Sequence, residues 1–450
     1  MSASRSPAAD VGAGPDHPSL VVLPPLEGAP TGSERREGGG AADGRCLTGA
    51  MDADALRLLL STEGLALLER VEASAQGSDA GLGIDDRDDV VRAVTRLRAE
   101  GHDPRLVAAV LTQLRLRRRA RAKFGEFASG MLFTEAGLEQ ATRLRVAAHH
   151  AGRMREAGIA SVADLGCGIG ADALAFATLG LEVTAVERDE VTAAVASYNL
   201  AAWHASVVHG DALETAVDAE ALWFDPARRD GRTRLSDPAD WSPGLDAVFA
   251  LASERPSGVK LAPGIDRALL PAEAEHQWVT DGLETVEAVV WTGRLAREGV
   301  ARSALVLGDG GAAELTGEAS HPEQGELGEF LFEPAGAVIR AELIGALADR
   351  LGATGVSDGI AYLSGPVHVA TPLAQAFRVR ETLPLDERGI ARRLRELGIG
   401  ELEIKKRGAD IDPAAFRKRL KLSGPQRATL FATRIGGRHR AVLADRVSAA

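Results

Sequence analysis

The spacing of apolar residues changes along the 450-residue chain and divides it into five segments. Residues 1–50 are rich in glycine, alanine, proline and serine without an apolar period, so we expect a disordered tail there. Residues 51–128 place leucine and valine at helical spacing and predict an N-terminal helical domain. Residues 129–310 alternate short apolar runs with helical patterns, residues 311–385 form a mixed connecting region, and residues 386–450 form a last α+β segment.

The segment 129–310 has the pattern of an α/β protein. Its first helix is predicted over Glu135–Met154, with Thr134 as the N-cap residue. Parallel strands joined by helical crossovers form a doubly wound sheet. Gly293 and Gly299 separate the last two predicted strands, which indicates a terminal antiparallel hairpin of those two. The predicted strands are Val162–Leu165, Val183–Glu187, Ser206–Val208, Ala221–Phe224, Gly258–Leu261, Thr285–Trp291 and Arg302–Leu307.

The pattern after residue 311 predicts further helices and strands. The connecting region carries one helix, Ala337–Leu351, and strands near Ile360–Leu363 and Ala376–Thr382, and its pattern assigns it no function. The last segment predicts the order helix, strand, helix, strand, strand. These elements span Gly389–Leu397, Glu401–Lys406, Pro413–Leu422, Ala428–Thr433 and Arg438–Leu443.

Charge is distributed unevenly in a chain of net charge −12. From Glu401 to Arg440 there are eleven lysines and arginines against four acids, a local balance of +7 that suggests a nucleic-acid partner. A helix predicted to start at Asp103 and Pro104 also ends in cations. That end is either a solvated C-terminus or a phosphate-binding surface. Its cations are Arg115, Arg117, Arg118, Arg119, Arg121 and Lys123.

Composition excludes several classes of protein. With 45% hydrophobic and 26% charged residues the chain is an ordinary globular protein, and no apolar run approaches the roughly 20 residues of a membrane span. The two cysteines, Cys46 and Cys167, suggest neither a disulfide framework nor a metal site. The adjacent His149 and His150 point in different directions on a helix, which favours surface or packing roles. We therefore expect a cytoplasmic protein without a metal, and the N-terminus lacks the pattern of a signal peptide.

One glycine-rich stretch carries the candidate chemistry. The strand ending at Asp164 runs into Gly166, Gly168 and Gly170, and a helical pattern follows at once. Small residues let a strand turn sharply into a helix and let a ligand approach the backbone. The next strand ends on an acid, Glu187. This arrangement is typical of a nucleotide-like cofactor bound at the carboxyl ends of parallel strands.

The order Asp-x-Gly-x-Gly-x-Gly resembles the cofactor loop of class I S-adenosylmethionine-dependent methyltransferases. The resemblance implies S-adenosyl-L-methionine as cofactor, with Glu187 accepting both ribose hydroxyl protons. Asn199 follows Glu187 by twelve residues, as in many of those enzymes. Asp211, followed by Ala212, stands after the third strand, where an acid hydrogen-bonds the adenine amino group. The resemblance further implies that Asp164, Gly166 and Gly168 shape the methionine side of the pocket and that Phe133 and Thr134 close it.

A second motif points to the acceptor. Asp225 and Pro226 begin a sequence similar to the D/N-P-P-aromatic motif of enzymes that methylate exocyclic amines. There a carboxylate and backbone carbonyls accept the two amine hydrogens, so the nitrogen lone pair is aimed at the methyl group. The chain departs from that motif at Ala227 and at Arg228, which replaces the aromatic residue. Arg228 either contacts a base or phosphate of the substrate or is simply a loop arginine.

The wider sequence resembles a bacterial methyltransferase family with a C-terminal THUMP-like domain, over roughly residues 52–443. THUMP domains bind RNA in RNA-modifying enzymes, so the resemblance implies an RNA substrate contacted by Lys405, Lys406 and Arg407. The segments that carry it are Leu111–Gln113, Arg118–Ala120, Lys123–Gly125, Phe133–Thr134, Gly137–Thr142, Asp225–Asp230, Lys260–Gly264 and Ile404–Gly408.

Three functional hypotheses follow. The first is a methyltransferase that modifies a base nitrogen of tRNA or rRNA, with Asp225 and Pro226 orienting the acceptor. The second is a methyltransferase of a small molecule or protein, which would have no need of the basic C-terminal segment. The third is an RNA-binding protein whose methyltransferase core has lost catalysis. Methylation at C5 of a pyrimidine is excluded because neither cysteine is placed to be the nucleophile.

Overall fold

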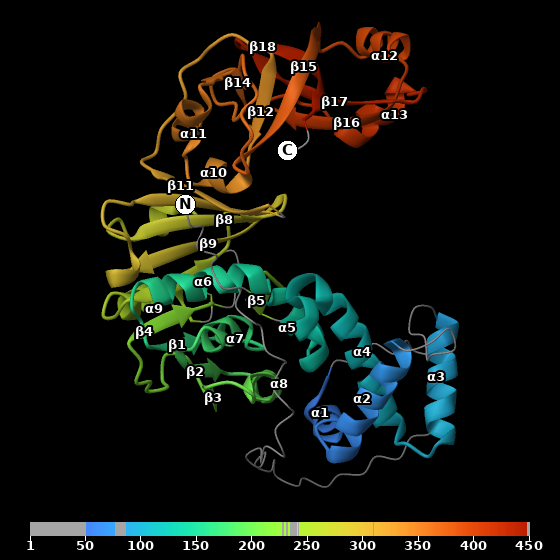
Figure 1. Ribbon diagram of the computed structural model, residues 1–450, viewed down its shortest axis with the longest axis vertical. Coiled ribbons are helices and arrows are strands. Elements are labelled where there is room, and N and C mark those ends of the chain that lie inside the picture. The colour runs from blue at the N-terminus through green and yellow to red at the C-terminus, as the bar shows by residue number, and fades with distance from the viewer. Residues whose placement is uncertain are drawn as a thin grey trace, which may run out of the picture.

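The computed structural model describes residues 51–76, 87–226, 229–230, 233–234, 241, 243–308 and 310–447. The predicted tail at residues 1–50 and the candidate residue Arg228 lie outside these ranges. Within them the chain forms an N-terminal group of helices, a nine-stranded sheet and a seven-stranded sheet (Figure 1). No helix in the described part of the chain has the length and apolar character needed to cross a membrane.

The N-terminal helices are α1 (Ala53–Leu59), α2 (Thr62–Gln76), α3 (Arg87–Ala99) and α4 (Pro104–Phe124), which continues into the 3-10 helix η1 (Gly125–Gly130). The predicted start of α4 is confirmed. The Asp103 side chain accepts a hydrogen bond from the Arg105 backbone N–H, and Pro104 occupies the first turn, where no backbone donor is needed.

The helix predicted over Glu135–Met154 is wrong, because the structure divides it into α5 (Glu135–Gln140) and α6 (Leu144–Glu156). Ala141 has extended backbone angles, and the Lys123 ammonium donates to the carbonyls of Leu138, Glu139 and Ala141. These bonds satisfy carbonyl groups that a helix end leaves open. The predicted N-cap is confirmed: Thr134 Oγ1 accepts from the Gly137 N–H at 3.0 Å.

The nine-stranded sheet has the order β11-β10-β8-β9-β7-β4-β1-β2-β3. Neighbours from β3 to β7 are parallel. Helices α6, α7 and α8 pack against one face and α9 against the other, which confirms the predicted doubly wound sheet. The short strands β5 (Arg229–Asp230) and β6 (Thr233–Arg234) form a separate ladder. The strands and helices of the nine-stranded layer are β1 (Ser161–Leu165), α7 (Ala171–Thr178), β2 (Glu182–Glu187), α8 (Glu190–Leu200), β3 (Ala205–His209), β4 (Ala221–Phe224), α9 (Leu245–Ala252), β7 (Ser257–Leu261), η3 (Arg267–Leu269), β8 (Glu275–Asp281), β9 (Glu284–Thr292), η4 (Gly293–Leu295), β10 (Arg302–Gly308) and β11 (Gly311–Gly317).

The predicted terminal hairpin of the two strands beside Gly293 and Gly299 is wrong. Strand β9 pairs with β7 and β8, and β10 pairs with β8 and β11. The sequence prediction missed β8 because its first residue is a glutamate. The Glu275 carboxylate is fully buried, where it pairs with Arg153 and Arg297 and accepts from the Ser303 hydroxyl. Strands β10 and β11 pair across the predicted segment limit at 310/311.

The seven-stranded sheet has the order β13-β14-β12-β15-β18-β17-β16. Its strand β15 pairs with β18 across the predicted limit at 385/386. The predicted helix Ala337–Leu351 is interrupted at Ala341–Leu343, where Glu342 has φ +59° and its carboxylate pairs with Arg267 and Arg302. The elements are β12 (Phe330–Pro334), α10 (Gly336–Arg340), α11 (Ile344–Leu351), β13 (Thr354–Gly355), β14 (Leu363–Gly365), β15 (Ala374–Pro384), α12 (Glu387–Glu396), β16 (Ile399–Arg407), α13 (Pro413–Leu420), β17 (Gln426–Ile435) and β18 (Arg438–Arg446).

Two large apolar cores connect these parts. One extends from α1–α4 to α7, α8 and one face of the nine-stranded sheet. The other extends from the opposite face of that sheet to α10, α11, β12 and β15. The Ala337 N–H also donates to Thr280 Oγ1 at 2.8 Å, joining α10 to β8. The nine-stranded sheet therefore shares a buried core with the helices before it and with the sheet after it.

Candidate active site

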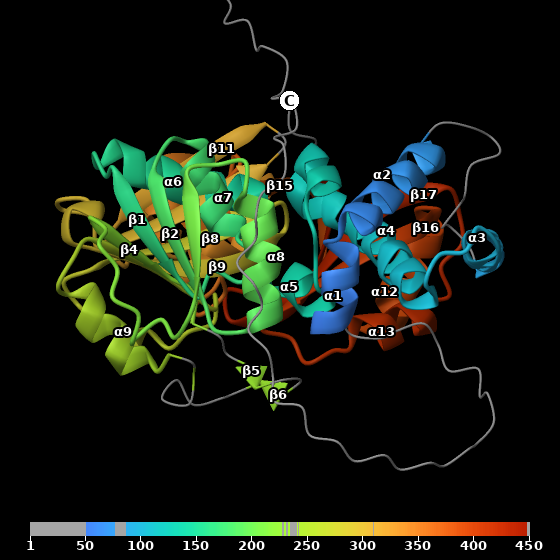
Figure 2. The ribbon, with the colours of Figure 1, turned by 90° about the horizontal axis from the view of Figure 1, so that it is seen from below.

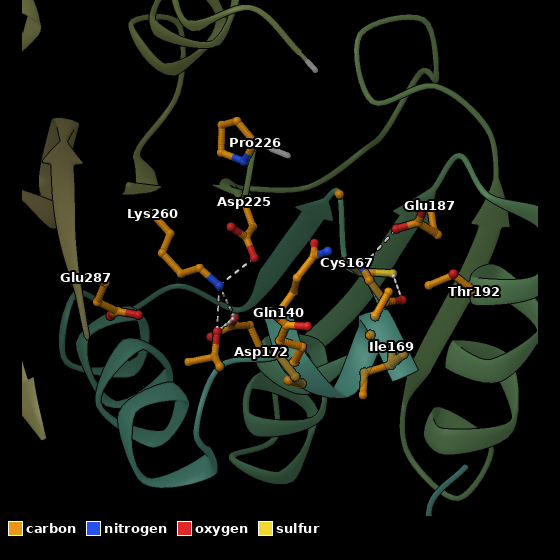
Figure 3. A pocket seen from close by; sticks show the side chains of 18 of the residues that line it. Gln140, Cys167, Ile169, Asp172, Glu187, Thr192, Asp225, Pro226, Lys260 and Glu287 are labelled. Atoms are coloured by element: carbon orange, nitrogen blue, oxygen red, sulfur yellow. Dashed lines mark hydrogen bonds and ion pairs between the residues drawn. The ribbon is translucent and has the colours of Figure 1, made fainter. Parts of the chain in front are cut away.

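A cavity of about 630 Å³ opens at the carboxyl ends of β1, β2, β4 and β7. This is the edge of an open α/β sheet where ligands bind. Figure 3 shows acidic and basic side chains converging from these strands, from β9 and from α7, with Gln140 of α5 beside them. Eight of the residues selected from the sequence line it: Thr134, Gly166, Gly168, Glu187, Asp211, Ala212, Asp225 and Pro226.

The loop after β1 requires its glycines. Gly166, Gly168 and Gly170 have φ of +96°, +57° and +85°, a region that side chains other than glycine rarely adopt. A Cβ on Gly166 would also lie 3.1 Å from the Asp225 carbonyl oxygen. The loop is fixed to β2 because the N–H groups of Gly166 and Cys167 both donate to the Val186 carbonyl. Bare backbone is therefore presented to the cavity.

Glu187 lies at the end of β2 with its carboxylate held from both sides. One oxygen accepts from the Gly168 N–H and the other from the Asp189 N–H, both at 2.9 Å. Each oxygen keeps a lone pair for a ligand hydroxyl. Asp211, after β3, is similarly held by the Leu213 N–H at 2.8 Å. Two oriented carboxylates thus line the side of the cavity beside β2 and β3.

Asp164 is only 1% exposed and does not line the cavity. Neither of its carboxylate oxygens has a hydrogen-bond partner among the described residues. Burial, followed by the charges of Asp172 and Asp225, holds the pKa of Asp164 well above its usual value. An unpaired buried carboxyl beneath the glycine loop matches a site that is completed by a polar ligand.

Phe133 also does not line the cavity, because its ring is buried against Phe124 with the centroids 5.5 Å apart. Its backbone nevertheless belongs to a clamp. Gln113 donates to the Phe133 carbonyl at 2.7 Å and accepts from its N–H at 3.0 Å. Asn199 accepts from the Leu132 N–H and donates to the carbonyls of Leu132 and Ile169. The two amides thereby join the segment before α5 to α4 and to the glycine loop.

Replacing Asn199 with alanine is expected to loosen this clamp. The change leaves one buried N–H and two buried carbonyls without partners, so we expect a free energy of unfolding lower by about 2–3 kcal/mol. Urea denaturation of wild type and variant measures it, and Asn199→Asp is the matched comparison because it keeps only the acceptor. A loss below about 0.5 kcal/mol would contradict the role of the clamp.

A buried cation, which the sequence prediction did not select, lies at the base of the cavity. Lys260, at the end of β7, pairs with Asp225 at 2.5 Å and donates to Thr142 Oγ1 at 2.7 Å (Figure 3). The Thr142 hydroxyl donates to Asp172 at 2.6 Å, and Asp172 lies 3.9 Å from the ammonium. Burial alone would lower the pKa of Lys260, but Asp225, Asp172 and Glu287 outweigh it and hold the pKa above its usual value. Burial also raises the pKa of Asp225 against the opposing effect of Lys260.

His150 extends this network beneath the cavity. Its Nδ1 lies 2.8 Å from Asp172 and its Nε2 lies 2.7 Å from Glu287. Burial would lower the pKa of His150, but Glu287 and Asp172 raise it to about 9, so both ring nitrogens donate at neutral pH. The ring stacks on Trp223 with the centroids 4.4 Å apart. The prediction of a surface or packing role therefore missed a buried ion-paired histidine.

The cations of α4 mostly serve the fold. Arg117 is buried and binds the Met131 carbonyl and Glu72, while Arg115 and Arg119 both pair with Glu135. Burial lowers the pKa of Lys123 to about 8 although the ammonium donates to three carbonyls. The contacts of Arg117 and Lys123 show structural cations. Arg115 and Arg119 are half-exposed beside Glu135, so both alternatives stay open at these two residues.

The basic residues selected on β16 lie on the seven-stranded sheet and do not line the cavity. Lys405 pairs with Glu333 at 2.7 Å, and the Arg407 guanidinium lies 4.9 Å from the centre of the Tyr362 ring. Lys406 is exposed. No group of acids, histidines or cysteines that could hold a metal ion occurs within the described ranges.

Two parts of the chain match known protein families. Residues 374–446 match a THUMP domain-like family, and residues 52–120 match a domain of unknown function. Two uncharacterised S-adenosylmethionine-dependent methyltransferases from strains of Mycobacterium tuberculosis are each 36% identical over 333 residues, covering 71% of this chain and 91% of theirs. A candidate methyltransferase from Porphyromonas gingivalis, solved by crystallography, shares 20% identity with a TM-score of 0.65 and covers 86% of this chain and 99% of its own. At that identity it supports the fold alone.

The sheet, the glycine loop and the acids at the strand ends define a class I methyltransferase with a C-terminal THUMP-like domain. The chain belongs to the family of S-adenosylmethionine-dependent methyltransferases. The cavity is compatible with that cofactor, because the bare backbone of Gly166 and Gly168 and the oriented carboxylate of Glu187 line it. Asp164 lies buried outside the cavity lining, with no partner for its carboxylate among the described residues.

Proposed function

We propose that the protein transfers a methyl group from S-adenosylmethionine to a nitrogen of a nucleobase in tRNA or rRNA. The observation that carries the proposal is the carboxylate of Asp225, which lines the cavity beside Pro226 while the buried Lys260 ammonium fixes one of its oxygens. A carboxylate held this way accepts a hydrogen from an exocyclic amine in one orientation. The amine lone pair is then directed toward the cofactor.

We assign the cofactor groups along the cavity from the residues that line it. Glu187 accepts from the ribose hydroxyls, Asp211 with Ala212 holds the adenine, and Thr134 lies on the opposite wall. Asp164, Gly166 and Gly168 hold the methionine end, with Phe133 supporting that wall from within the core. The bound cofactor supplies an activated methyl group on sulfur. The acceptor nitrogen gains the methyl and sheds a proton, for which Asp225 is the nearest placed carboxylate.

An RNA substrate is supported by the THUMP domain-like match and by the excess of cations in the same part of the chain. We propose that Lys405, Lys406 and Arg407 contact the RNA backbone on the seven-stranded sheet and that Arg228 contacts it near the acceptor. We propose a cytoplasmic location, where these RNAs are modified.

The test is transfer of labelled methyl from S-adenosylmethionine to total RNA from cells that lack the protein. We expect Asp225→Ala to lower kcat/KM about 100-fold and Asp225→Asn to lower it less, because an amide oxygen still accepts from an amine. Asp218→Asn, an exposed carboxylate in the same domain, is the control and should retain full activity. Label appearing only in protein or small molecules, and in no RNA fraction, would overturn the proposal.

A further inference from the structure

A leucine stands fully exposed at the edge of the proposed acceptor site. Leu283 is 94% exposed and occupies the tip of the hairpin formed by β8 and β9. The hairpin is closed by the pair Asp281 and Glu284, so its loop has only two residues. Gly282, with φ +64°, supplies the positive φ that a type II′ turn requires at its first central position. The second central position, occupied by Leu283, would accept a polar residue equally well, so the geometry of the turn does not require a leucine there.

The tip is next to the cavity. Glu284, Thr285, Val286 and Glu287, the residues that follow Leu283 on β9, all line it. In Figure 1 the hairpin end projects toward the side of the molecule where α5 and α4 lie below and the C-terminal sheet lies above. Leu283 thus stands beside the cavity, one residue before the first of these four lining positions.

The tip is also held rigidly. Arg143 donates to Asp281 at 2.8 Å and pairs with Glu284, and Arg145 pairs with the second oxygen of Asp281. Both strands of the hairpin lie inside the nine-stranded sheet, where Val279 is fully buried. An apolar side chain on a turn anchored at both of its ends keeps a fixed position relative to the cavity.

Asp225, the carboxylate proposed to hold the acceptor amine, lines the cavity, so a base must leave its stack to reach it. Proteins that unstack nucleic acids insert apolar side chains, leucine among them, between bases. Resting on the proposed function, we propose that Leu283 is a wedge that fills the space left in the RNA when the target base turns into the cavity. The substrate class is therefore a nucleotide stacked within folded RNA.

Because the wedge acts after the RNA has bound, its loss should change kcat and not KM for RNA. This pattern distinguishes the wedge from a structural role. In methyl transfer to the total RNA described above, we expect Leu283→Ala to lower kcat about tenfold while KM for RNA stays within twofold. Leu283→Met, which restores an apolar side chain of similar length, should recover most of the rate. Leu269→Ala removes a half-exposed leucine of the same domain whose neighbours in the chain do not line the cavity, and it should leave both constants unchanged.

The outcomes distinguish the wedge from the function on which it rests. Absence of transfer to RNA by the wild type overturns the proposed function and the wedge with it. Wild-type kcat in Leu283→Ala, or a tenfold loss that Leu283→Met does not repair, overturns the wedge alone. Calorimetric titration with S-adenosylmethionine should give equal Kd values for wild type and variants, and weaker binding by Leu283→Ala would assign its defect to the fold of the site.

Discussion

Replacement of Lys260 with methionine is expected to lower the free energy of unfolding by about 3–5 kcal/mol and to reduce methyl transfer by more than about 100-fold. The lysine side chain is only 12% exposed, and its removal leaves Asp225 without a compensating cation and Asp172 with His150 alone. Asp225 would also lose the contact that orients its carboxylate in the cavity, and small displacements of a reacting group cost about two orders of magnitude. Urea denaturation and the RNA methylation assay measure the two effects.

The double variant Lys260→Met with Asp225→Asn separates stability from activity. Removing the charge of both partners should restore most of the lost unfolding free energy, because no unpaired buried charge remains at that pair. Activity should remain low, since the orienting contact is still absent. Lys406→Met, an exposed lysine on β16, serves as the stability control. A Lys260→Met protein within about 1 kcal/mol of wild type would contradict the compensating role of the ammonium.

The stability contributed by His150 is expected to disappear as the pH rises from about 6.5 to about 9. The folded pKa of about 9 lies above the ordinary value of 6.5, so the folded state binds the proton more tightly than the unfolded state. The stabilisation is complete below pH 6.5 and is lost as the pH passes through the folded pKa. A shift of this size corresponds to about 3 kcal/mol.

The measurement is the unfolding free energy of wild type and His150→Gln at several pH values between 6 and 10. The difference between the two proteins should shrink with increasing pH by about 3 kcal/mol. Other titrating groups contribute equally to the pH dependence of both proteins, so their contributions cancel in this difference. They include Cys167, whose thiol pKa is raised by burial, and Lys123, whose pKa is lowered to about 8. Parallel curves for the two proteins would show that His150 is not charged in the folded state.

Short local patterns predicted the glycine loop and the acids that line the cavity. The glycines after β1 and the acids at the ends of β2, β3 and β4 are set by strand ends and tight turns, which neighbouring residues determine. They could be read without tertiary information. The α12–β16–α13–β17–β18 order was predicted for the same reason, because each element has a clear period and short connections.

The remainder depends on residues far apart in sequence. Lys260 and Thr142 are separated by 118 positions, and His150 and Glu287 by 137, so no local pattern links them. The same holds for the errors. The helix break between α5 and α6 is stabilised by Lys123 from α4. The local pattern did not indicate β8, because Glu275 can be buried there only through pairing with two arginines far away in sequence. Phe133 was placed at the cavity because its position in the chain is adjacent, although its ring turns into the core.

The shared cores have a consequence for how a target is chosen. Because α10, α11, β12 and β15 pack in one core with the nine-stranded sheet, the THUMP-like part and the cavity are held at a constant separation. If the substrate is the RNA proposed above, the nucleotide that is modified would be set by its distance from the part of the RNA bound at the C-terminal sheet. Lengthening the RNA between these two points by a few base pairs should then move methylation to a new nucleotide or abolish it, rather than leave the original one modified.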